Sequence, residues 1–77
     1  MIKTGGYYAN NIGTFIYQVL AIRGNEVVIA FVDLEDMNAV WQGRNYTVHK
    51  SALQHDRQAT KEERAKLQGI MLYGWCI

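Results

Sequence analysis

Residues 14–33 read TFIYQVLAIRGNEVVIAFVD, which is two apolar runs separated by a Gly-Asn pair. β-Branched and aromatic residues dominate both runs, as is typical of strands. Gly24 and Asn25 accept positive φ angles at low cost, which favours a tight turn between the runs. The stretch therefore predicts a β-hairpin with strands over 14–22 and 26–33.

Both strands of this hairpin are apolar on both faces. Strict alternation places on one face of the first strand Phe15, Tyr17, Val19 and Ala21. On its other face, alternation places Ile16, Leu20 and Ile22. A half-exposed hairpin would alternate apolar and polar residues, so something must cover the second face. Barrel closure, the C-terminal segment and another subunit are the three candidates.

Further short elements flank the hairpin. Short strands are expected over 7–9, 38–41 and 45–49, and a single helical turn over 50–54. Several short strands at close spacing suggest a small barrel. We therefore expect a mainly β fold, a strongly bent antiparallel barrel of four or five strands, over residues 7–55.

A helix is expected near the C-terminus, within residues 58–77. Thr60 and Glu63 have the spacing of a capping box, which predicts a helix from 61 to at least 68. Leu67 and Ile70 lie one turn apart on one helical face. Gly69 costs a helix about 1 kcal/mol relative to alanine, so 69–77 is left open between helix and strand. The helix and the apolar tail are expected to cover the second face of the hairpin, within one chain or across a dimer.

The composition limits the classes of function. With 77 residues, the chain is expected to form a single domain, 1–77. A net charge of +1 argues against binding nucleic acid or anionic lipid mainly through bulk charge. The sequence contains neither a signal-peptide pattern nor an apolar run of the roughly 20 residues that span a bilayer, so a cytoplasmic location without membrane contact is expected.

Catalytic chemistry has little support in the sequence. One cysteine and two histidines are too few for the usual structural zinc sites. Cys76 lies in an apolar tail, where a thiol usually acts as a small hydrophobe. We therefore expect no enzyme activity, no cofactor and no metal. An active site built at a subunit junction of an oligomer is the remaining enzymatic alternative.

Acidic and aromatic residues give the candidate contacts for a protein partner. Three carboxylates lie within four positions at the end of the second strand and would attract a basic partner. Nine aromatic residues are more than a small barrel easily buries, so some are expected at the surface. The candidate contacts are Tyr8, Asp33, Glu35, Asp36, Trp41 and Tyr46.

The segment 8–53 resembles a Tudor-type, SH3-like small barrel. The resemblance rests on Tyr8, a Gly-containing turn before Phe15, the run YQVLAI, the pair Gly24-Asn25 and the corner AFVDLED at 30–36. It implies an SH3-like barrel, and the C-terminal helix lies outside the resemblance. It also implies an aromatic cage for methylated Lys or Arg, with Tyr8, Phe15 and Phe31 at cage positions and Asp36 as a polar contact. The chain departs from this pattern at Leu34, where a fourth aromatic is expected, and at Glu35, where the corner has glycine.

Taken together, the sequence predicts a non-enzymatic protein-interaction module, a small accessory or inhibitory factor that binds a larger protein. A homodimer through the C-terminal segment is also expected. The alternative is a KOW-like RNA-binding barrel. The basic residues that would bind nucleic acid are Arg44, Lys50, Arg57 and Lys61.

Overall fold

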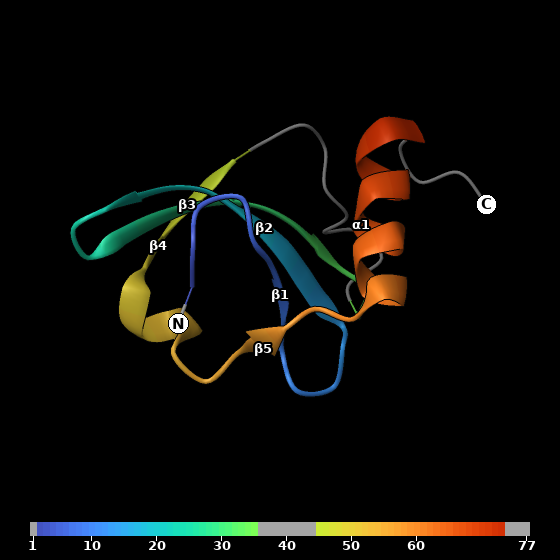
Figure 1. Cartoon of the computed structure of the whole chain (residues 1–77), viewed down its shortest axis with the longest axis horizontal. Coiled ribbons are helices and arrows are strands. Elements are labelled where there is room, and N and C mark those ends of the chain that lie inside the picture. Colours follow the sequence, from blue (N-terminus) through green and yellow to red (C-terminus); the bar gives the residue numbers. More distant parts are fainter. Residues whose placement is uncertain (1, 36–44, 74–77) are drawn as a thin grey trace.

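The computed structural model describes residues 2–35 and 45–73, which form one antiparallel sheet and a helix (Figure 1). The strand order in the sheet is β4-β3-β2-β1-β5. The elements are β1 (Tyr7–Ala9), β2 (Phe15–Arg23), β3 (Glu26–Asp33), β4 (Tyr46–His49), the 3-10 helix η1 (Lys50–Leu53), β5 (Arg57–Gln58) and α1 (Lys61–Tyr73). Because β4 and β5 are its two edges, the sheet of the described residues is open and does not close into a barrel.

The central hairpin is the one that the sequence predicts. β2 and β3 pair antiparallel from Phe15↔Asp33 to Arg23↔Glu26. Gly24 has a φ of 62° in the connecting turn, which a residue with a side chain rarely adopts. The expected short strands at 7–9 and 45–49 and the helical turn at 50–54 are also present, within one residue of their predicted bounds. The strand expected over 38–41 lies outside the described residues.

A β-bulge at Leu20 corrects the predicted alternation along β2. Val19 pairs with Ile29, but Ala21 pairs with Val28, so Leu20 is an extra residue. Directly paired residues lie on the same face of a sheet. Beyond the bulge, each residue of β2 therefore lies on the opposite face from the one that strict alternation predicts. Ala21 does not lie on the face of Tyr17 and Ile22 does not lie on the face of Ile16, as strict alternation had predicted.

Two apolar clusters lie on the two faces of the sheet. The first cluster is made of Tyr8, Tyr17, Val19, Val27, Ile29 and Leu53. The second is made of Ala9, Ile16, Val32, Leu67 and Ile70. The last two of these residues come from α1, which lies beside the sheet, at the opposite end from the β2–β3 turn (Figure 1). The C-terminal helix thus covers the part of the second face around Ala9, Ile16 and Val32 within one chain.

The helix begins at its predicted capping box. The Thr60 amide donates to Glu63 Oε1 at 2.9 Å, and the Glu63 amide donates to Thr60 Oγ1 at 3.2 Å. Gly69 does not end the helix, which continues to Tyr73. Residues 69–73 are therefore helical. Residues 74–77 lie outside the described residues, and the dimer through the C-terminal segment stays a prediction.

One strand was not expected from the sequence. Arg57 and Gln58 form β5, which pairs with β1 through Ala9↔Arg57 and Tyr8↔Gln58. The segment is polar and two residues long, so it has no apolar alternation to indicate a strand. It nevertheless carries the chain from η1 across the edge of the sheet to α1.

None of the helices in the described part of the chain combines the length and the apolar character that crossing a membrane requires.

Candidate functional site

Five aromatic rings form a continuous row on the face of the first cluster. Tyr8 and Phe15 each lie 5.8 Å from Tyr17 between ring centroids. Phe15 stacks on Phe31 at 4.9 Å, and Phe31 meets Tyr46 edge to face at 4.7 Å. We call these five residues the aromatic row. Four of its members come from three neighbouring strands: two from β2, one from β3 and one from β4. The row therefore runs across the sheet.

The aromatic row is buried at one end and exposed at the other. Tyr17 is fully buried, Phe15 and Phe31 are half-buried, and Tyr46 is 47% exposed. The stacked rings of Phe15 and Phe31 are tilted by only 25° and contact each other, so no ligand fits between them. The exposed end of the row therefore presents the Tyr46 ring and the edges of the Phe15 and Phe31 rings. It does not form a cage that encloses a methylated cation.

Tyr8 lies in the buried part of the row. Its side chain is 9% exposed, and its hydroxyl accepts a hydrogen bond from the Lys3 amide at 2.8 Å. Gly6 passes so close to this ring that a Cβ atom there would lie 2.6 Å from the hydroxyl oxygen. Tyr8 is thus a core residue held by the N-terminal segment, in contrast to the exposed contact that the sequence suggested.

Asp33 lies beside Phe15, in the half-buried middle of the row. It pairs with Phe15 across β2 and β3, which places the two side chains on the same face. Its Oδ1 atom accepts a hydrogen bond from the Glu35 amide at 3.1 Å, so the chain turns immediately after β3. Of the other predicted contacts, Glu35 is exposed in this turn, whereas Asp36 and Trp41 lie outside the described residues.

Two of the predicted nucleic-acid contacts, Lys50 and Lys61, lie on different elements. Lys50 is exposed at the start of η1, and Lys61 is exposed at the start of α1. These two lysines line different cavities. Arg57 is engaged by a carboxylate, as described next, and Arg44 lies outside the described residues.

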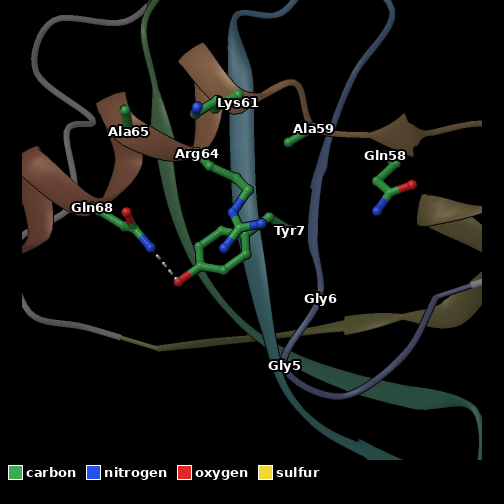
Figure 2. Close-up of a pocket in the computed structure, with 9 residues that line it drawn as sticks. All are labelled: Gly5, Gly6, Tyr7, Gln58, Ala59, Lys61, Arg64, Ala65 and Gln68. Atoms are coloured by element: carbon green, nitrogen blue, oxygen red, sulfur yellow. Dashed lines mark hydrogen bonds between the residues drawn. The ribbon is translucent and has the colours of Figure 1, made fainter.

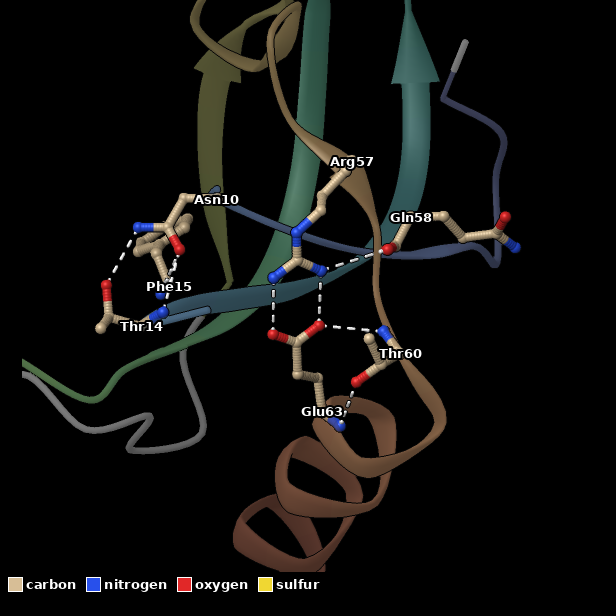
Figure 3. A network of polar contacts seen from close by, with 7 residues as sticks. All are labelled: Asn10, Thr14, Phe15, Arg57, Gln58, Thr60 and Glu63. Carbon is tan, nitrogen blue, oxygen red and sulfur yellow. Dashed lines mark hydrogen bonds and ion pairs between the residues drawn. The ribbon is translucent and has the colours of Figure 1, made fainter. Parts of the chain in front are cut away.

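Arg57 and Glu63 form a two-pronged ion pair that joins β5 to α1. The guanidinium donates to both carboxylate oxygens, at 2.7 and 2.8 Å (Figure 3). Hydrogen bonds from Arg57 and from the Thr60 amide lower the pKa of Glu63 from 4.5 to about 2, and the carboxylate raises the pKa of Arg57. This pair thereby ties β5 to the first turn of α1.

A tight turn over residues 10–15 lies against this ion pair. The Asn10 side-chain oxygen accepts hydrogen bonds from the amides of Thr14 and Phe15, at 2.9 and 3.2 Å (Figure 3). Gly13 has a φ of 74°, and a Cβ atom there would collide with the Glu63 carboxylate. The turn before β2 therefore packs closely against the first turn of α1.

Two cavities border β5. One has a volume of about 620 Å³ and lies between the Gly5-Gly6 segment, β5 and α1 (Figure 2). The other has a volume of about 390 Å³ and is lined by residues of η1 and β5 together with Ile2 and Tyr8. Neither cavity is predictable from the sequence, because the polar strand β5 between them has no apolar alternation to indicate it.

Comparisons with known proteins assign no family. The chain matches no protein-family model, no curated protein and no solved structure. Among residues 2–35 and 45–73, no group of three His, Cys, Asp or Glu side chains is placed to hold a metal ion. The site must therefore be interpreted from its own geometry.

Proposed function

We propose that the protein is a non-enzymatic interaction module that binds a basic segment of a larger protein, as a small accessory or inhibitory factor does. The observation that carries the proposal is that the exposed Tyr46 ring, at one end of the aromatic row, and Asp33, beside Phe15, lie on the same face of the sheet. Ring faces attract cations, and a carboxylate attracts them by its charge. This combination favours lysine and arginine side chains over acidic or purely apolar ones.

The spacing of these groups supports an extended ligand. Tyr46 pairs with Ile29, which precedes Asp33 by four positions in β3. At about 3.3 Å per residue, the two ends of the surface lie about 13 Å apart along the strand. An extended peptide of about four residues spans this length. The partner segment is thus expected to be short and to carry a cation near each end.

Two features of the sheet support the finer interpretation of an SH3-like fold. β5 returns after η1 to pair with β1, and the bulge at Leu20 bends the central hairpin. A bent five-stranded sheet of this size is compatible with a half-open small barrel. Fold likeness supports only a class of function, so the proposal rests on the aromatic row and Asp33.

The test is an NMR titration of the isotope-labelled full chain at low salt with a hexapeptide of alternating Lys and Ser. Amide shifts are expected at Phe31, Asp33 and Tyr46, and a peptide with Glu in place of Lys should leave them unchanged. Tyr46→Ala should weaken binding by about threefold or more, because an exposed cation–π contact contributes about 0.5–1 kcal/mol. Asp33→Asn should also weaken it.

Leu20→Ala is the matched control for this titration. Leu20 is likewise an exposed apolar residue of the sheet, but it lies outside the aromatic row. The control should bind the basic peptide as the unchanged chain does. Equal binding of the acidic peptide, or equal loss in Leu20→Ala and Tyr46→Ala, would contradict the proposal.

A further inference from the structure

The larger cavity next to β5 is a groove with cationic and amide groups on its walls (Figure 2). Lys61 and Arg64 line it from α1, and Gln58 and Gln68 line it from β5 and from the next turn of the helix. None of the described residues that line it is acidic. Its volume of about 620 Å³ falls within the range of small-molecule sites, about 300–1,000 Å³. The walls therefore favour a small anion.

Arg64 is held in place at the centre of this groove. Its guanidinium carbon lies 4.7 Å from the centre of the Tyr7 ring. The Tyr7 hydroxyl accepts a hydrogen bond from the side-chain amide of Gln68, Nε2, at 3.2 Å (Figure 2). Stacking on a ring occupies the face of a guanidinium but leaves the N–H groups at its edge able to donate. Residues 2–35 and 45–73 contain a single ion pair, which joins Arg57 to Glu63. No carboxylate in this part of the chain therefore forms an ion pair with Arg64.

The backbone on the opposite wall permits close approach. Gly5 and Gly6 line the groove without side chains. Gly6 is fixed as glycine by the Tyr8 ring behind it, which a Cβ atom would overlap. The narrow N-terminal segment thus keeps the groove open opposite the two cations.

We propose that this groove binds a phosphate monoester, such as the phosphate of a nucleotide, through Lys61 and Arg64. A monoester dianion matches the two positive charges, and the planar fork of arginine matches two phosphate oxygens at once. The side-chain amides of Gln58 and Gln68 also line the groove and would bind the remaining polar part of the ligand. The site is independent of the aromatic row, because Tyr7 packs against the second cluster on the other face of the sheet.

The experiment titrates the isotope-labelled full chain at low salt with AMP, and with adenosine as the uncharged counterpart. AMP should shift the amides of Gly5, Gly6, Lys61, Arg64 and Gln68, whereas adenosine should not. Arg64→Gln and Lys61→Gln should each weaken AMP binding about tenfold, as expected for loss of a charge-assisted hydrogen bond.

Lys66→Gln is the matched control, since it removes the same charge from the same helix outside the groove. It should bind AMP as the unchanged chain does. Equal weakening by Lys66→Gln and Arg64→Gln would show general charge attraction and overturn the proposal. Equal binding of AMP and adenosine, or stronger binding of succinate than of AMP, would overturn it as well.

Two RNA hexamers, with and without a 5′-phosphate, identify the source of the phosphate. Binding of AMP alone would indicate a free nucleotide, and binding of the phosphorylated hexamer alone would indicate a chain end; both support a monoester site. Equal binding of the two hexamers without AMP binding would indicate backbone phosphodiesters and overturn it. Tyr46→Ala should not alter any of these results, so this proposal and the peptide-binding proposal fail separately.

Discussion

The Tyr17 hydroxyl donates a 2.8 Å hydrogen bond to Asp56 Oδ2 and thereby ties the first half of β2 to the residue before β5. Tyr17 is fully buried at the centre of the first cluster. Burial, followed by the hydrogen bond to Asp56, raises the pKa of Tyr17 far above its ordinary value of 10. The contact links a central strand to the segment that separates the two cavities.

Tyr17→Phe is expected to lower the free energy of unfolding by about 1–2 kcal/mol, because it leaves Asp56 without its buried donor. Urea denaturation followed by far-UV circular dichroism measures this change. Tyr46→Phe, at an exposed hydroxyl, serves as the control and should have little effect. Equal stability of Tyr17→Phe and the unchanged chain would show that the hydrogen bond contributes nothing.

The raised pKa of Tyr17 also predicts behaviour in alkali. Its contribution to stability is complete below pH 10, the pKa of an unfolded tyrosine, and is lost as the pH rises above that value. In an alkaline titration followed by tyrosinate absorbance, the Tyr17 phenol should ionise only together with unfolding. Ionisation of all five tyrosines while the far-UV spectrum remains native would contradict this prediction.

Glu63 predicts a loss of stability in acid. Its pKa of about 2 lies below the 4.5 of an unfolded glutamate, so its contribution is present above pH 4.5 and is lost as the pH falls toward 2. Glu63→Gln should make the melting temperature less dependent on pH within this window. Glu62→Gln, the neighbouring exposed position, leaves the ion pair intact and should keep the dependence of the unchanged chain.

Gly13 is expected to tolerate no side chain. Gly13→Ala strains a residue with a φ of 74° and drives a methyl group into the Glu63 carboxylate. We expect a loss of about 1 kcal/mol or more in the free energy of unfolding from the backbone alone. Gly24→Ala has the same kind of strain but meets no atom within 4 Å, so urea denaturation should show a smaller loss for it.

The parts of the fold that rest on local signals were predictable, and those that rest on contacts across the chain were not. The hairpin follows from the Gly24-Asn25 turn, and the start of α1 follows from Thr60 and Glu63. The bulge at Leu20 was missed because both faces of β2 are apolar, so a one-residue shift changes nothing visible in the pattern.

The candidate sites show the same division. Asp33 and Tyr46 were identifiable by residue type, but the stacking of Phe15 on Phe31, which closes the space a cage would need, depends on strand register. The groove depends on Tyr7 and Arg64, which are far apart in the sequence. Only the three-dimensional structure places Arg64 over a ring.

Leu67 joins α1 to the sheet and is fully buried in the second cluster. Leu67→Ala should lower the free energy of unfolding by about 2–5 kcal/mol, because the cavity left between the helix and β2 cannot fill with solvent. Ile70→Val, a smaller deletion in the same cluster, should cost about 0.5–1.5 kcal/mol. Lys66→Ala, on the exposed side of the helix, should be nearly neutral in the same urea denaturation. If Leu67→Ala melts the helix by circular dichroism while the Tyr17 ring keeps its native near-UV signal, the two clusters unfold separately, and the helix is not part of one cooperative unit.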